Sequence, residues 1–251
     1  MIKSLKRLFS RQGQGQGQRR DLSGLERWAK RRGHGFKRVR DEDGFVIDGL
    51  LEGRPWRIEW GPPQRDYIAG HELRLRMELN LPFDAQMLVL SRPLMDSLER
   101  QTFEEFTDNV QTQIGTKTPE EMRWLVVFSK VSLVSLKALR THFGAVANVP
   151  ATGLAWLEGP LANMLEHAAS EWLRDGQPFV LMTLRGRAYL RMQMATPEPE
   201  SVAAALALFE TAVAQALRVA GDHIDRDADS GVRSTAWQSF PPDDREPPNR
   251  R

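Results

Sequence analysis

Residues Phe45–Trp60 read FVIDGLLEGRPWRIEW, and this stretch decides the fold class. From Trp56 to Trp60 apolar residues alternate with charged ones, and this period of two residues puts one side of a β-strand in the core and the other in water. Glu52-Gly53 separates this strand from the apolar run before it and has the composition of a hairpin turn. The stretch therefore predicts a β-hairpin.

The same alternation occurs further along the chain. Leu73–Leu79 alternates apolar residues with Arg and Glu, which predicts a third strand with one wet face. Phe179–Leu184 and Ala188–Met194 flank Arg185-Gly186 and predict a second hairpin. Met87–Leu90 predicts a short additional strand. The sequence leaves open whether the two hairpins share one sheet.

Helical segments lie between these strands, and they are marked by Pro at their starts and Gly after their ends. We expect helices over Leu22–Arg32, Pro93–Gln111, Val131–Phe143, Pro160–Arg174 and Glu200–Ala220. The inner face of the second helix is predicted to comprise Leu94, Leu98, Phe103 and Phe106. Asn148–Gly153 is predicted as a loop, and Trp124–Phe128 fits either a strand or the start of a helix. The resulting class is α+β, with antiparallel hairpins packed against helices.

Some segments resemble one another, which suggests an internal duplication. Gly53-x-Pro55-Trp56 resembles Gly176-x-Pro178-Phe179, and Leu75–Leu79 resembles Leu190–Met194. If the duplication is real, the body forms two similar lobes over 21–115 and 116–222. Convergent patterning is the alternative, since helices often start with Pro and strands alternate.

Charge and composition divide the chain into three parts. Residues 1–40 hold thirteen Lys and Arg against Asp21 and Glu26, which gives +11, and the whole chain carries only +2, so the remainder carries −9. We expect a basic leader with a Gln/Gly linker over 1–20, a globular body over 21–222 and a disordered acidic, Pro-rich tail over 223–251.

The leader has the pattern of a surface-binding helix. Its apolar residues would share one side of the helix and its basic residues the other: Ile2, Leu5, Leu8 and Phe9 against Lys3, Lys6, Arg7 and Arg11. A basic amphipathic segment of this kind is typical of contact with an anionic membrane. The alternatives are an arm that binds nucleic acid or an acidic partner, and a tail without a specific role.

No catalytic, metal-binding or nucleotide-binding motif stands out. The chain has no cysteine, which excludes disulfides, thiolate catalysis and cysteine zinc sites. None of the five histidines has metal-ligand spacing to another. The longest uninterrupted apolar runs, such as Val202–Phe209, are short of the roughly 20 residues that span a bilayer. We expect no cofactor or metal, and a cytoplasmic protein that can attach at the inner face of the membrane.

Two further groups are candidates for contact with a partner. Arg185, Arg187 and Arg191 lie on the second hairpin and could hold a phosphate or an acidic partner. Trp237 and Phe240 are aromatic residues in an otherwise polar tail, where such residues serve as docking motifs. Arg57, Arg74 and Arg76 alternate with acidic residues, so we expect them to form cross-strand ion pairs on a wet face.

These observations favour a non-catalytic binding or adaptor module that the leader tethers to an anionic membrane. Its protein partner is not identified by the sequence, and a homo-oligomer would strengthen a weak tether by avidity. The first alternative is a protein that associates with nucleic acid through the leader, although such proteins usually carry their basic patch on the folded part. The second is an enzyme with an unrecognised site.

Overall fold

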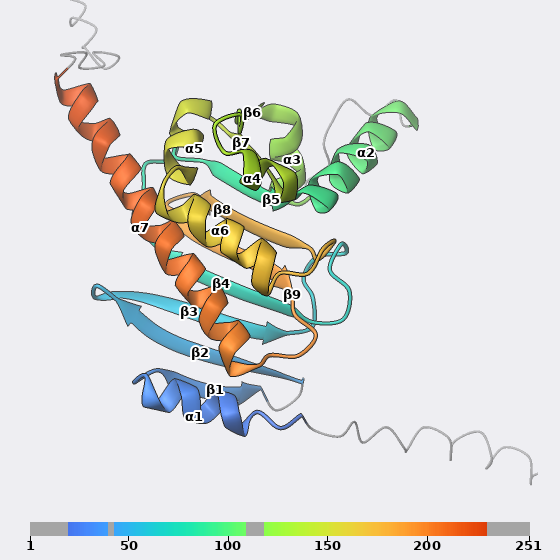
Figure 1. Cartoon of the computed structure of the whole chain (residues 1–251), viewed down its shortest axis with the longest axis vertical. Helices are drawn as coiled ribbons and strands as arrows, with labels where there is room; N and C mark the ends of the chain where they lie inside the picture. The colour runs from blue at the N-terminus through green and yellow to red at the C-terminus, as the bar shows by residue number, and fades with distance from the viewer. Residues whose placement is uncertain (1–19, 40–42, 109–117, 230–251) are drawn as a thin grey trace, which may run out of the picture.

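A computed structural model describes residues 20–39, 43–108 and 118–229, and it shows an α+β fold. Nine strands form one antiparallel sheet with helices on both faces (Figure 1). The strands are β1 (Gly35–Val39), β2 (Gly44–Leu51), β3 (Arg54–Gly61), β4 (Glu72–Glu78), β5 (Met87–Ser91), β6 (Ser129–Lys130), β7 (Phe143–Ala147), β8 (Phe179–Leu184) and β9 (Arg187–Gln193). The helices are α1 (Ser23–Arg31), α2 (Arg92–Asp108), α3 (Glu120–Val127), α4 (Lys137–His142), α5 (Pro150–Leu157), α6 (Pro160–Glu171) and α7 (Pro199–Asp229).

The strand order is β1-β2-β3-β4-β9-β8-β5-β7-β6, so both predicted hairpins belong to the same sheet. They meet where β4 pairs with β9, with Leu75 opposite Leu190. Strand β5 lies between β8 and β7, which both come from the second half of the chain. The internal duplication is not confirmed, because the halves interleave in one sheet.

The turns of the two hairpins have the geometry that their sequences predict. Glu52 and Gly53 have φ of 51° and 78°, and Arg185 and Gly186 have φ of 51° and 77°. Two successive positive φ values are the mark of a type I′ turn, whose twist matches that of the flanking strands. Glycine at the second position of each turn makes this geometry accessible.

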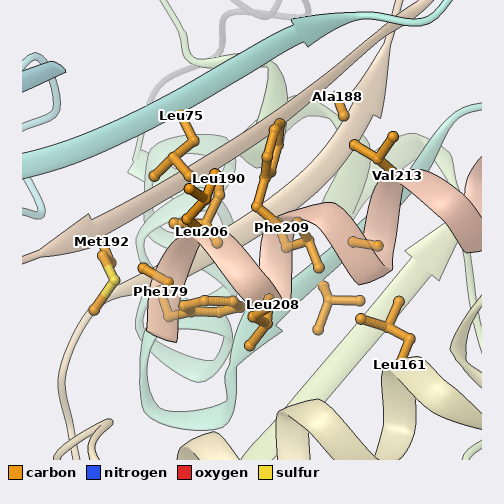
Figure 2. Packing of buried hydrophobic residues seen from close by; sticks show 14 of the residues in the cluster. Leu75, Leu161, Phe179, Ala188, Leu190, Met192, Leu206, Leu208, Phe209 and Val213 are labelled. Atoms are coloured by element: carbon orange, nitrogen blue, oxygen red, sulfur yellow. The ribbon is translucent and has the colours of Figure 1, made fainter. Parts of the chain in front are cut away.

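One face of the sheet, called the inner face below, holds the main core. Helices α1, α5, α6 and α7 pack on it, and α7 runs diagonally across the strands (Figure 1). Figure 2 shows Leu206 and Phe209 of α7 gathered with Leu75, Leu190 and Phe179 of the sheet. All five side chains are buried, so the period-two pattern of the strands meets the apolar stripe of the helix.

The other face, called the outer face, divides into two parts. Helices α2 and α3 cover its apolar part, which is made by Leu88, Leu90, Val146, Val180 and Met182 of β5, β7 and β8. The outer sides of β2, β3, β4 and β9 instead carry charged side chains, most of which stay partly exposed, and we call this part the open face. The change from apolar to charged occurs between neighbouring strands β8 and β9.

The helix predicted over Val131–Phe143 is wrong for most of its length. Only Lys137–His142 is helical, as α4, and β7 begins at Phe143. All five residues of β7 are buried, since α5 lies on its inner side and α2 and α3 on its outer side. A strand buried on both faces shows no alternation in its sequence, and its apolar residues therefore resemble a continuing helix.

The predicted loop Asn148–Gly153 is shorter than expected: Asn148 and Val149 lie between β7 and α5, and Pro150 opens α5 as its first helical residue. A β-carbon at Gly153 would lie 2.8 Å from both Ala147 and Val131, so this glycine permits close packing of α5 on the sheet. The segment Trp124–Phe128, left open between strand and helix, belongs mainly to α3.

Helix α2 buries fewer of its apolar side chains than the sequence predicts. Leu94 and Leu98 are buried, but Phe103 is 70% exposed. The second half of α2 extends past the sheet (Figure 1), which agrees with the exposure of Phe103. The side chain of Phe106 lies outside the described residues.

Helix α7 extends to Asp229, past the predicted end at Gly221, so the first residues of the predicted tail are helical. Among the described residues, α7 over Pro199–Gly221 is the one helix long and apolar enough to cross a bilayer by length and composition. Half of this window is buried in the protein, as in the core helix of a soluble fold, so its apolarity is weak evidence for a membrane span.

Candidate functional site: a basic edge of the sheet

Helix α1 presents a basic surface because its apolar residues all lie on one side. Leu25, Trp28 and Ala29 are buried against the sheet. Arg27, Lys30 and Arg31 are exposed on the opposite side of the helix. Lys30 and Arg31 lie in the last turn of α1, where positive charge also interacts favourably with the helix dipole.

The basic surface continues onto the edge strand. After α1 the chain turns at Arg32 and Gly33, which has φ of 73°, and enters β1, where Lys37 and Arg38 are exposed. Charged side chains are common on edge strands, where they discourage pairing with another chain. We call the six exposed cations of this region the basic edge: Arg27, Lys30, Arg31, Arg32, Lys37 and Arg38.

None of the basic edge residues forms an ion pair within the part of the chain that the structure describes. Arg27 donates a hydrogen bond to the Ser23 carbonyl, 3.3 Å away. Arg32 lies toward α7, where its charge partly offsets the rise that burial causes in the pKa of Glu210. Hydrogen bonds to Ser23 lower the pKa of Asp21, and the charges of Arg38 and Arg27 act in the same direction. Because the six cations outnumber these acidic neighbours and form no ion pair in the described structure, most of their positive charge faces solvent.

This finding changes the interpretation of the charge pattern. The charge pattern of the sequence predicts a basic leader, whereas in the structure Arg20 and the six cations of the basic edge lie on the folded body. Helix α1 and strand β1, which carry most of the basic edge, lie at the lower end of the sheet in Figure 1. The folded part thus carries a basic surface of its own.

Arg20 ties the start of the body to the sheet. Its Nε lies 3.1 Å from Asp43 Oδ2, and its guanidinium lies 5.1 Å from the ring centre of Trp60. The His71 ring stacks on Trp60 with ring centroids 4.3 Å apart, and Trp60 Nε1 donates to the Met194 carbonyl at 2.8 Å. Arg20 is therefore held between Asp43 and the ring of Trp60 on β3.

The environment of His71 lowers its pKa. Burial disfavours the charged imidazolium, and the positive charge of Arg20 acts in the same direction, while Asp43 opposes both. Burial also lowers the pKa of His34, whose ring lies between Trp28 and Trp56 with centroids 5.7 Å and 4.8 Å away. Both histidines thus favour the neutral form in the folded protein.

The open face has the predicted cross-strand ion pairs. Arg57 Nε lies 2.6 Å from Asp48 Oδ1, and Glu59 lies 3.5 Å from Arg74 and 3.7 Å from Arg76. These pairs run across β2, β3 and β4 on one side of the sheet. The prediction of ion pairing on a wet face is confirmed.

The candidates Arg185, Arg187 and Arg191 have three different carboxylates as partners. Arg185 lies 3.3 Å from Glu120 of α3, Arg187 lies 2.5 Å from Glu78, and Arg191 lies 2.6 Å from Glu72. Arg187 and Arg191 point to the open face, while Arg185 lies in the turn. Binding of a phosphate or an acidic partner by these three residues stays a prediction.

The carboxylates of Glu72 on β4 and Glu121 on α3 are fully buried, a feature that sequence reasoning missed. Glu72 accepts from Arg74, Arg191 and the Gln64 backbone amide, and Glu121 accepts from Arg65 and Tyr67. Burial would raise the pKa of Glu121, but the hydrogen bond and charge of Arg65 outweigh it and lower the pKa. Burial and the charge of Glu121 raise the pKa of Tyr67, so this hydroxyl stays protonated as a donor.

Some predicted sites lie outside the described residues: the membrane-contact residues Ile2, Lys3, Leu5, Lys6, Arg7, Leu8, Phe9 and Arg11, and the tail residues Trp237 and Phe240. In the described part of the chain, no group of three or more His, Asp or Glu side chains could hold a metal ion. The basic edge is therefore the strongest candidate site on the described surface.

No protein-family model, curated protein or solved structure shows significant similarity to this chain.

Proposed function

We propose that this protein is a non-catalytic binding module that docks on an anionic membrane through its basic edge, with the leader as a second contact. The observation that carries the proposal is the set of six exposed cations on α1 and β1, none of which forms an ion pair within the described structure. Each Lys or Arg near an anionic leaflet contributes about 1 kcal/mol, which falls with salt.

The arrangement favours a flat surface as the binding partner. The basic edge occupies one end of an elongated sheet, and α1 is about 13 Å long at 1.5 Å per residue. The chain beyond residue 40 carries −9, and this charge can face away from a planar leaflet when only one end makes contact. The leader adds predicted apolar contacts, which a lipid surface accepts and a nucleic acid backbone does not.

The experiment is flotation of the full chain with vesicles of phosphatidylcholine containing 30% phosphatidylserine, at low and high salt. We expect binding at low salt, release at high salt, and at least a tenfold weaker affinity for the variant R27E/K30E/R31E. The matched control K137E/R140E/R174E makes the same change of net charge at three other exposed positions and should bind like the unmodified chain.

Two outcomes would contradict the proposal. Equal binding by the two triple variants would show that net charge, not the basic edge, governs attachment. Binding to a 20-base-pair DNA duplex at low salt, without binding to the vesicles, would favour the nucleic-acid alternative. Removal of residues 1–20 tests the contribution of the leader separately.

A further inference from the structure

Two pairs of arginines face each other directly across neighbouring strands of the open face. Arg74 of β4 lies opposite Arg191 of β9, and Arg57 of β3 lies opposite Arg76 of β4. Like charges at directly opposed positions destabilise a sheet unless an anion lies between them. Each pair therefore requires a negative partner.

The first pair has an internal partner. Glu72 Oε2 lies 3.3 Å from Arg74 Nη1, and Glu72 Oε1 lies 2.6 Å from Arg191 Nη1. The carboxylate is fully buried and accepts a third hydrogen bond from the Gln64 amide. One carboxylate is thus enough to bridge two opposed guanidinium groups on this sheet.

The second pair is only partly neutralised. Arg57 has Asp48 at 2.6 Å, but among the described residues the ion-pair partner of Arg76 is Glu59 alone, at 3.7 Å, and Glu59 is shared with Arg74. The Arg76 side chain is 57% exposed, whereas that of Arg74 is 16% exposed. The open face as a whole sets five guanidinium groups against four carboxylates: Arg57, Arg74, Arg76, Arg187 and Arg191 against Asp48, Glu59, Glu72 and Glu78.

A hollow of about 340 Å³ lies beside the second pair. Its lining includes Asp48, Arg57, Arg76, Glu78, Arg187 and Tyr189. Tyr189 lies opposite Arg76 on β9 and beside Arg187, whose pKa is raised by hydrogen bonds to Glu78 and Tyr189. The hollow is therefore lined by Arg76, whose charge is incompletely paired, and by the aromatic ring of Tyr189.

We propose that this hollow binds a carboxylate from an acidic peptide segment of a partner protein, with Arg76 and Arg57 as the ligands. The carboxylate would occupy the place between the opposed guanidinium groups that Glu72 occupies in the first pair, and bidentate contacts suit this geometry. The excess of one positive charge matches a monoanion better than a phosphate dianion, because Asp48 and Glu78 lie in the same hollow. This site is independent of the proposed membrane contact.

The test uses NMR of the arginine Nε–H groups during titration of the full chain with hexaglutamate. We expect saturable shifts of the Arg57 and Arg76 resonances, and roughly tenfold weaker binding at this site in R76Q, the loss of one charged hydrogen bond. R174Q removes an exposed arginine outside the hollow and should bind like the unmodified chain. Inorganic phosphate, titrated in parallel, should bind more weakly than hexaglutamate.

The variant R27E/K30E/R31E separates this site from the basic edge, which also attracts an acidic peptide. In that variant the Arg57 and Arg76 shifts should persist with unchanged affinity, whatever the vesicle experiment shows. The proposal is overturned if hexaglutamate shifts only basic edge resonances, if R76Q binds as tightly as R174Q, or if phosphate binds as well as the peptide.

Discussion

The arginines of the open face and the cations of the basic edge belong to the same small body, yet their surroundings are opposite. Arg191 lies 2.6 Å from the fully buried Glu72, while Lys30 and Arg31 are exposed and have no acidic partner in the described structure. A paired cation beside a buried carboxylate stabilises the fold, because loss of either partner leaves a desolvated charge. A solvated cation without a partner contributes little to folding and remains available for binding. Whether a cation stabilises the fold or remains available for binding therefore depends on its exposure and its ion pairs, and not on its charge alone.

The largest effect should come from removing the buried anion. Glu72→Gln would leave Arg74 and Arg191 opposed without a bridging charge, and we expect a loss of about 3 kcal/mol of unfolding free energy. Urea denaturation followed by tryptophan fluorescence measures this change. The control Glu78→Gln breaks a pair whose side chains are about half exposed, and it should leave the urea midpoint nearly unchanged. Equal losses of unfolding free energy in the two variants would contradict the distinction between buried and exposed ion pairs.

A smaller loss of stability is expected at acidic pH, because the pKa values of His34 and His71 are lowered in the folded protein. The unfolded chain titrates near the ordinary value of 6.5 and the folded chain at lower pH, so the unfolded state binds more protons between these values. The stability that these histidines contribute is thus present above pH 6.5 and is lost as the pH falls through the folded pKa. His71→Gln should reduce the dependence of the urea midpoint on pH between 7 and 5. An unchanged slope would show that His71 does not contribute.

The smallest effect is expected at the basic edge. R27Q/K30Q/R31Q should change the unfolding free energy by less than about 0.5 kcal/mol per residue, mostly through the lost favourable interaction of Lys30 and Arg31 with the C-terminal end of α1. The same urea experiment measures this change. If the variant loses as much stability as Glu72→Gln, the basic edge stabilises the fold in the same way as the paired arginines of the open face.

The sequence predicts those parts of the fold whose signals are local. The two hairpins follow from alternation and from Glu52-Gly53 and Arg185-Gly186, because turn geometry and period two need no information from distant residues. Strand β7 could not be found in this way, since burial on both faces depends on which helices cover it. Pro150 resembles a loop residue until α5 is seen to start there.

The candidate site was predictable only in part. Counting charges places the positive residues within the first forty positions, but the pairing of each cation depends on contacts distant in sequence. Glu121 is neutralised by Arg65 from the loop before β4, and Arg191 by Glu72, which is 119 residues away. The absence of such partners around α1 and β1 in the described structure could be seen only after the fold was known.

The insertion of β5 between β8 and β7 has a consequence for how the chain reaches its native state. Strand β5 needs Phe143–Ala147 and Phe179–Leu184 as neighbours, and β4 needs Arg187–Gln193. During synthesis β4 and β5 therefore lack these neighbouring strands until the chain through β9 has left the ribosome. Contacts this distant in sequence make folding slow and leave the nascent chain prone to aggregation. A fragment that stops near residue 115 should not fold independently.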